Sequence, residues 1–330
     1  MLIPLDFSPF SGWLLVFFLG LGLVGLFFGG EFLCRGAASL ARLARISPLV
    51  IGLTVVSIAT SMPEMFTSLA ASLADKSGMV IGNIVGSNIS NIALILGAAA
   101  LISPLAVESQ IIRQEMPILV ALTMLFFLLA LGGLARVEGL LLLGLGTAYC
   151  IFIIRQAKQK GAEEKSLVEE ETIPSLGLRP CLGLILGGTL LLSVGADLLV
   201  QSSSEIALRM GVSDVLIGLT LVAIGTSLPE LATSLAAAWH RHADICVGNL
   251  IGSNLFNIVL IGGGTALLFP FGIERMLLSF EFPVMLFLTF LLWPFVFTGK
   301  IVSRREGLIL LLLFGAFLWG TFSLRFQFVG

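Results

Sequence analysis

The sequence predicts an all-α integral membrane protein of about ten transmembrane helices, arranged as two inverted repeats of five helices. Three observations support this fold class: the composition, the spacing of apolar stretches and an internal repeat. Of the 330 residues, 57% are hydrophobic and only 12% are charged, and the mean hydropathy is +1.08. Soluble domains are about 45–50% apolar and about 25% charged, so this composition excludes an ordinary soluble globule.

Polar residues divide the chain into ten apolar stretches, most of them near the length of about 20 residues that crosses a bilayer as a helix. We expect these spans near 11–33, 48–74, 79–102, 116–134, 138–156, 178–201, 214–240, 244–269, 278–298 and 306–323. The most polar stretch follows the fifth span. Residues 157–177 are therefore expected to form a linker between a first five-helix repeat at 1–156 and a second at 178–330.

Loop charges predict the orientation of these spans. Loops on the side of the N-terminus contain five Lys and Arg residues, whereas the opposite side, including the linker, contains thirteen. Because positive loops stay in the cytoplasm, both termini should lie outside and the linker should be cytoplasmic. Lys+Arg 18 against Asp+Glu 20 gives a net charge of -2, so no basic face is available for nucleic acid. The expected surroundings are the lipid bilayer, and no feature indicates an obligate protein partner.

An internal repeat relates the two halves of the chain. Residues 52–97 align with 218–263 without a gap, and 24 of the 46 positions are identical at a constant offset of 166. The identical residues are largely Gly, Ser, Thr, Asn, Pro and Glu, so apolar composition alone does not explain the agreement. Since five spans is an odd number, the second copy enters the membrane from the opposite side. Such inverted repeats bind their substrate near the midplane, where broken helices from the two halves meet.

Each copy of the motif places a glutamate near the middle of an apolar span. Glu64 and Glu230 follow Pro63 and Pro229 directly. A charged residue at this depth is costly and usually marks an ion or proton pathway. Proline removes a backbone donor and clashes with the carbonyl four residues back, so both helices should break just before their glutamates. The sequence therefore predicts two broken helices whose carboxylates face a central site.

The remaining polar side chains of the motif supply further oxygen atoms. The threonines lie one helical turn before the glutamates, and the next span of each copy has a serine and an asparagine four residues apart. Carboxylate, hydroxyl, amide and loosened backbone oxygens are hard ligands that suit Ca²⁺ or Na⁺, and no thiolate or imidazole joins them. These residues are Thr60 and Thr226, Ser87 and Asn91, and Ser253 and Asn257. For the four other shared asparagines, hydrogen bonding between helices is favoured over ion contact: Asn83, Asn88, Asn249 and Asn254.

The two motifs resemble a known family. GLTVVSIATSMPEMFTSLAAS…IGNIVGSNISN and GLTLVAIGTSLPELATSLAAA…VGNLIGSNLFN are similar to the α-1 and α-2 repeats of the cation/calcium antiporter superfamily, and most similar to its short prokaryotic sodium/calcium exchangers. The resemblance implies a bacterial or archaeal plasma membrane, transported Ca²⁺ and Na⁺ and no cofactor. It implies an ion site centred on Glu64 and Glu230. Around them it implies side chains of Thr60, Ser61, Thr226, Ser227, Ser87, Asn91, Ser253 and Asn257, and backbone oxygens of Ser57 and Ala223.

The resemblance predicts a secondary antiporter that exchanges Na⁺ for Ca²⁺ by alternating access, with Ca²⁺ extrusion as its role. Members of the family often carry Asp at the position of Asn257, so the sodium stoichiometry stays open. The proton-coupled branch has a GNxxE pattern, whereas this chain has GNIVG and GNLIG, which favours sodium. H⁺/Ca²⁺ antiport through the same glutamates is the main alternative, and an ion channel is another. An intramembrane enzyme is not expected, because no HExxH, GxSxG or comparable motif is present.

Overall fold

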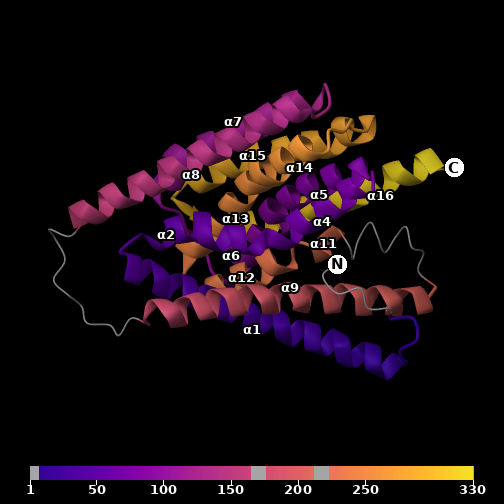
Figure 1. Cartoon of the computed structure of the whole chain (residues 1–330), viewed down its shortest axis with the longest axis horizontal. Coiled ribbons are helices and arrows are strands. Elements are labelled where there is room, and N and C mark those ends of the chain that lie inside the picture. The colour runs from indigo at the N-terminus through magenta and orange to yellow at the C-terminus, as the bar shows by residue number, and fades with distance from the viewer. Residues whose placement is uncertain (1–6, 165–175, 212–222, 330) are drawn as a thin grey trace.

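The computed structural model describes residues 7–164, 176–211 and 223–329, and these are almost entirely helical (Figure 1). Among them, eight helices are long and apolar enough to cross a membrane, or nine if the bent pair Pro48–Thr60 and Met62–Leu73 forms one span. The predicted span at 214–240 lies partly outside the described residues. The predicted class of an all-α membrane protein is confirmed.

Labels follow Figure 1, and η marks a π-helical segment. The first half contains α1 (Gly12–Ala44), α2 (Pro48–Ile51), η1 (Gly52–Val56), α3 (Ser57–Thr60), α4 (Met62–Leu73), α5 (Ser77–Ile89), η2 (Ser90–Ile95), α6 (Leu96–Ile102), β1 (Leu105–Ala106), η3 (Ile111–Glu115), α7 (Met116–Ala130) and α8 (Arg136–Glu164). The second half contains α9 (Leu178–Arg209), α11 (Ala223–Gly225), α12 (Leu228–Trp239), α13 (Ala243–Phe256), η5 (Asn257–Gly262), α14 (Gly263–Leu268), η6 (Leu277–Glu281), α15 (Phe282–Phe297), β2 (Ile301–Val302) and α16 (Arg304–Val329).

The helices run along the long axis of the molecule, and the two halves run in opposite directions. In Figure 1, α1 begins and α16 ends toward the same end of the molecule, whereas α8 ends and α9 begins at the other end. The first helices of the two halves, α1 and α9, lie side by side across the bundle. This is the arrangement expected of inverted repeats.

Glycines bring α1 and α9 into close contact. A Cβ at Gly22 would lie 2.8 Å from the carbonyl oxygen of Gly195, and one at Gly29 would lie 3.0 Å from that of Gly188. The residue numbers rise along one helix and fall along the other, so the helices are antiparallel. The repeat offset relates Gly22 to Gly188 and Gly29 to Gly195, so each helix contributes the same two positions to the crossing. Small residues are the usual means by which membrane helices pack closely.

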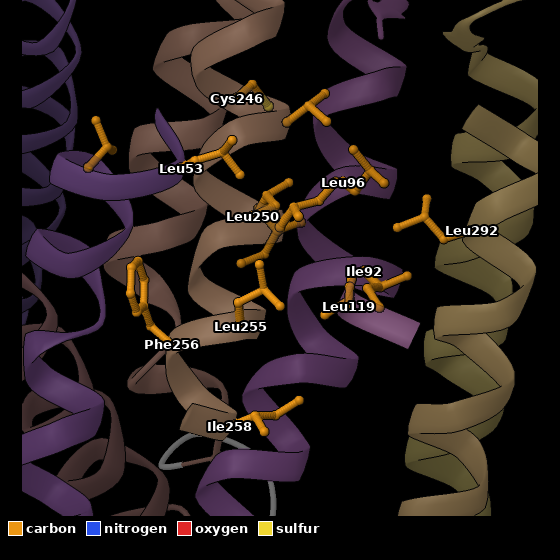
Figure 2. Packing of buried hydrophobic residues seen from close by; sticks show 14 of the residues in the cluster. Leu53, Ile92, Leu96, Leu119, Cys246, Leu250, Leu255, Phe256, Ile258 and Leu292 are labelled. Atoms are coloured by element: carbon orange, nitrogen blue, oxygen red, sulfur yellow. The ribbon is translucent and has the colours of Figure 1, made fainter. Parts of the chain in front are cut away.

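The helix formed by α13, η5 and α14 is the centre of the bundle, since 94% of its most apolar stretch is buried, whereas only 17% of that of α16 is buried. Figure 2 shows Leu250 of α13 among residues of three other segments: Leu53 of η1, Ile92 of η2 and Leu292 of α15. The helices over Ser77–Ile102 and Ala243–Leu268, which hold the later part of each repeat motif, are therefore largely enclosed by protein, while peripheral helices expose apolar side chains to the bilayer.

Short strands connect the halves at two places. Strand β1 pairs antiparallel with β2, in the register Leu105 with Val302, and Leu134 forms an isolated bridge with Phe271. The second bridge is the counterpart of the first, because Leu105 and Phe271 are equivalent positions under the repeat offset. The backbones of the two halves are thus hydrogen-bonded to each other at two places in the loops between helices.

Several helices continue beyond the predicted spans. Helix α8 runs to Glu164, so the predicted linker 157–177 begins inside a helix, and α9 starts at Leu178 and runs to Arg209. Helix α1 runs to Ala44, where Arg45 adopts a left-handed conformation with φ 55° and closes the last turn. These extensions are polar but contain no proline, so the helical hydrogen bonds continue past the apolar boundary.

The π-helical segments were not predicted. Pro117 and Pro283 follow η3 and η6 within two residues, and each removes a backbone N–H that would continue the α-helical bonding pattern. The preceding turn widens as a result. Segments η2 and η5 begin at Ser90 and Asn257, inside the repeat motifs, where π-turns often mark functional positions.

Candidate ion-binding site

Two broken helices position the central glutamates. The segment Pro48–Thr60 bends by 41° into α4 at Ser61, and Glu64 lies in the first turn of α4. In the second half, Glu230 lies in the first turn of α12, and the residue before this helix, Ser227, has nearly the same backbone angles as Ser61. Each carboxyl therefore lies at a helix N-terminus, whose dipole stabilises negative charge. The predicted breaks before the glutamates are confirmed.

The two glutamates meet in the interior of the protein. Each is only 1% exposed, and the two carboxyl groups lie close enough to interact with each other. The hydroxyl of Ser61 donates to Oε1 of Glu230 at 3.2 Å. Both oxygens of Glu64 and Oε2 of Glu230 have no hydrogen-bond donor in the part of the chain that the structure describes. The ion pairs among described residues do not involve either glutamate. Among the described residues, the site thus brings two carboxyl groups together with no protein cation paired to either.

Serines of the next helices contact the helix breaks of the opposite half. The hydroxyls of Ser87 and Ser227 lie 3.3 Å apart, and those of Thr60 and Ser253 lie 3.4 Å apart. Helix α13 lies very close to the helix that leads into the first break. A Cβ at Gly252 would lie only 2.6 Å from the carbonyl oxygen of Leu53, so no larger residue fits there. Small residues at this position thus allow the polar side chains to meet.

The two threonines direct their hydroxyls to asparagines of the opposite half. Thr60 donates to Oδ1 of Asn249 at 3.1 Å, and Thr226 donates to Oδ1 of Asn83 at 3.2 Å. Each asparagine also donates to a serine of its own half. Asn83 bonds Ser68 at 2.8 Å and the main-chain oxygen of Glu64 at 3.0 Å, and Asn249 bonds Ser234 at 3.3 Å. The prediction that these asparagines bond helix to helix is confirmed.

Asn91 and Asn257 are bound in the same crossed manner. The amide nitrogen of Asn91 donates to Asn254 at 2.9 Å, and that of Asn257 donates to Asn88 at 3.1 Å. The Oδ1 atoms of Asn91 and Asn257 are buried and have no donor among the described residues. In addition, α12 packs against η2 and α4 packs against η5. Each glutamate-bearing helix therefore contacts the segment of the opposite half that carries an asparagine.

The structure thus brings most of the predicted residues together, with differences at the helix breaks. The backbone oxygen of Ser57 accepts a bond from the Ser61 N–H at 3.0 Å, so it is already used within its helix. Its hydroxyl bonds the carbonyl of Thr54 at 3.2 Å. Ala223 begins α11, and the structure describes only its backbone. The hydroxyls of Thr60 and Thr226 give their hydrogens to asparagines and leave oxygen lone pairs.

A second pair of buried glutamates was not predicted from the sequence. Glu115 and Glu281 are equivalent under the repeat offset, are at most 5% exposed, and lie two residues before Pro117 and Pro283. Glu115 accepts bonds from Gln110 at 3.1 Å and Tyr149 at 2.8 Å. The Glu-x-Pro spacing at the repeat offset was the signal that could have identified them. The recognised motif ends before this position.

The chain is similar to known proteins over most of its length. The family described as "Sodium/calcium exchanger protein" matches residues 14–156 and 181–323. The chain is 39% identical over 313 residues to the putative antiporter CaxA of Alkalimonas amylolytica, covering 93% of this chain and 98% of the relative. It is 36% identical over 335 residues to the sodium/calcium exchanger MaX1 of Methanosarcina acetivorans, covering 90% and 95%. It is 39% identical over 270 residues to the inner membrane protein YrbG of Escherichia coli, covering 80% and 83%.

The fold is also similar to a solved structure. The sodium-calcium exchanger NCX_Mj, soaked with Na⁺ and Ca²⁺, superposes with a TM-score of 0.81 and 32% identity, covering 94% of this chain and 99% of that chain. The similarity therefore extends over both halves and over the helices outside the repeat motifs.

Proposed function

Because the chain belongs to the sodium/calcium exchanger family, a family of multi-pass membrane antiporters, we propose that it exchanges Na⁺ for Ca²⁺ across a prokaryotic plasma membrane by alternating access. Glu64 and Glu230 are the central ligands of the transported ion. The observation that carries this proposal is that these two buried carboxyl groups, one from each half, lie close enough to interact and take part in no ion pair among the described residues.

The charge of the site explains why transport is an exchange. Two ionised glutamates carry a charge of about -2, which one Ca²⁺ or two Na⁺ neutralise. Uncompensated charge is costly in a low-dielectric interior, so neither the empty ionised site nor a partly filled one crosses the apolar barrier readily. The site therefore moves when one kind of ion fills it and returns when the other kind does. This coupling makes the protein an antiporter and not a channel.

The oxygen atoms available at the site fit these ions. Five buried oxygens of the predicted site residues have no donor among the described residues: Glu64 Oε1 and Oε2, Glu230 Oε2, Asn91 Oδ1 and Asn257 Oδ1. Calcium takes six to eight oxygen ligands in flexible geometry, and the hydroxyls of Ser61, Ser87, Ser227 and Ser253 can complete such a shell. The substrate is accordingly a hard cation held by carboxylate, amide and hydroxyl oxygens, with no resident cofactor.

The direction of transport follows from gradients and orientation. We propose that both termini lie outside and that the segment between α8 and α9 is cytoplasmic, as the loop charges indicate. An inward Na⁺ gradient would then drive Ca²⁺ out of the cell. Asn91 and Asn257 are both neutral, so the two glutamates set the charge of the site.

Counter-flow in proteoliposomes tests the proposal. Vesicles containing the purified protein are loaded with Na⁺, K⁺ or choline and diluted into ⁴⁵Ca²⁺, with and without an imposed pH gradient. We expect uptake only when Na⁺ is inside and its gradient is outward. Uptake driven by a pH gradient in the absence of Na⁺ would instead identify H⁺/Ca²⁺ antiport through the same glutamates. A flux that needs no counter-ion would identify a channel and contradict the exchange mechanism.

A further inference from the structure

The two asparagines of the candidate site are held by a second pair of asparagines. Asn91 donates its amide hydrogen to Oδ1 of Asn254 at 2.9 Å, and Asn257 donates to Oδ1 of Asn88 at 3.1 Å. All four side chains are at most 2% exposed. The two bonds are related by the repeat offset, and each joins opposite halves of the chain.

A carboxamide has one end that attracts a cation and one that repels it. The nitrogen ends of Asn91 and Asn257 are occupied by the bonds to Asn254 and Asn88, whereas their Oδ1 atoms have no donor among the described residues. Turning either group by half a rotation would direct an N–H to the place now taken by the oxygen. The acceptor on the opposite half therefore decides which end of the carboxamide is available to an ion.

We propose that Asn88 and Asn254 are positioning residues that fix the carboxamides of Asn257 and Asn91 with their oxygens available to the transported cation. The inference rests on the proposed site but not on the identity of the counter-ion. Asn88 and Asn254 act through their neighbours and do not themselves bind the ion.

The surroundings hold the two positioning residues differently. The amide nitrogen of Asn88 lies 3.7 Å from the sulfur of Met285 on α15, which is only a weak acceptor, so its oxygen remains the better partner for Asn257. Asn254 and Asn91 instead line a small cavity of about 10 Å³ beside Leu292 and Val296 of α15, about the space needed by one water molecule. Helix α15 thus lies beside both asparagine pairs, Asn88 with Asn257 and Asn254 with Asn91.

Replacing Asn257 with aspartate offers a direct test, because a carboxylate presents oxygen whichever way it turns. Asn88→Leu removes the acceptor while keeping a similar shape. In the parent, this change should raise the Kd for ⁴⁵Ca²⁺ of the purified protein about tenfold, equivalent to about 1.4 kcal/mol. In the Asn257→Asp background, the same change should raise the Kd by less than about twofold, because no orientation remains to be lost.

Asn254→Leu is the matched control. It acts on Asn91, so its effect should be the same with asparagine or aspartate at position 257. If Asn88→Leu cannot be purified as a folded protein, Asn254→Leu in the parent and in an Asn91→Asp background provides the equivalent comparison.

Equal effects of Asn88→Leu in both backgrounds, or no effect in the parent, would show a merely structural role and overturn the inference. Because equilibrium Ca²⁺ binding is measured, a protein that binds as expected but exchanges Ca²⁺ for H⁺ contradicts the proposed function and leaves the inference standing. A parent that binds no Ca²⁺ contradicts both.

Discussion

The hydroxyl of Ser61 donates a hydrogen bond to Oε1 of Glu230 at 3.2 Å, although the two residues belong to opposite halves of the chain. The equivalent serine, Ser227, contacts the hydroxyl of Ser87 instead of Glu64. Two halves that match at most positions of the site therefore differ at this contact. Ser61 supports one glutamate, while both oxygens of the other have no donor among the described residues.

This difference predicts unequal effects for two equivalent serines. A hydrogen bond to a charged group is worth about 1.5–3 kcal/mol, so Ser61→Ala should weaken ⁴⁵Ca²⁺ binding about tenfold or more. Ser227→Ala should weaken it less. Thr123→Val serves as a control, because that hydroxyl bonds only the carbonyl of Leu119 in its own helix. Equal losses in the two serine variants would contradict the asymmetry.

Neutralising either central glutamate should abolish exchange while the protein still folds. Glu64→Gln and Glu230→Gln keep the shape of the side chain but remove half of the site's negative charge. Loss of a buried charge partner costs about 3–5 kcal/mol, which corresponds to a loss of Ca²⁺ affinity of at least about 100-fold. Sodium-dependent ⁴⁵Ca²⁺ uptake and size-exclusion profiles measure the two properties. Full uptake by both variants would reject the site.

Calcium should stabilise the folded protein against heat. A ligand that binds only the native state at 100 times its Kd contributes about 2.7 kcal/mol. We expect the melting temperature of the purified protein to rise with Ca²⁺ and to fall when a chelator removes it. Mg²⁺ requires a tighter octahedral shell and should stabilise less. The same rise in Glu230→Gln would mean that Ca²⁺ binds elsewhere.

The packing of α13 against the first helix break predicts that Gly252 does not tolerate a side chain. A Cβ there would lie 2.6 Å from the Leu53 carbonyl oxygen and 2.6 Å from the Ser57 hydroxyl. Gly252→Ala should therefore destabilise the protein by about 1–3 kcal/mol. Gly144→Ala is the control, because a Cβ at Gly144 meets no atom within 4 Å and alanine favours a helix by about 1 kcal/mol. Thermal unfolding in detergent measures the stability of both variants. If Gly252→Ala is as stable as the parent protein, the close contact is refuted.

A histidine between α12 and α13 predicts a pH dependence of stability. Burial lowers the pKa of His242 below its ordinary 6.5, and the neighbouring His240 and Arg42 lower it further, against the opposing charge of Asp244. The unfolded chain therefore takes up the proton more readily than the folded protein. Stability due to this group is present above pH 6.5 and is lost as the pH falls below it.

His242→Gln should reduce this loss, so its melting temperature should fall less than that of the parent between pH 8 and pH 5, roughly one to two units either side of an ordinary histidine pKa. A parallel pH profile for the parent and His242→Gln would contradict the assignment.

Much of the site could be predicted from the sequence because a repeat displays equivalent residues twice. The glutamates, their prolines and the Ser/Asn pairs stood out at a common offset, and proline chemistry predicted the breaks beside Ser61 and Ser227. The partners of Thr60 and Thr226 could not be predicted. A hydroxyl can bond its own helix, a neighbouring helix or an ion, and only the packing of the two halves selects among them.

Other features depend on chain geometry that composition does not encode. Helix α8 continues to Glu164 because polar residues can remain helical outside the bilayer, whereas the sequence analysis ended the span where hydropathy fell. The π-turns η3 and η6 directly precede Pro117 and Pro283, where the missing backbone N–H disturbs the α-helical bonding. The pairing of Leu105 with Val302 joins loops from opposite halves of the chain, and no local pattern identifies such partners.

The crossed hydrogen bonds also bear on how the chain arose. Thr60–Asn249 and Thr226–Asn83 are one contact made twice, as are Asn91–Asn254 and Asn257–Asn88. Contacts of this kind are those of an isologous interface, in which two copies of a subunit present the same patch to each other. An unfused ancestor with these residues could have assembled as an antiparallel homodimer, in which every mutation changed both sides at once. In a single chain that constraint is absent, so each half can change separately.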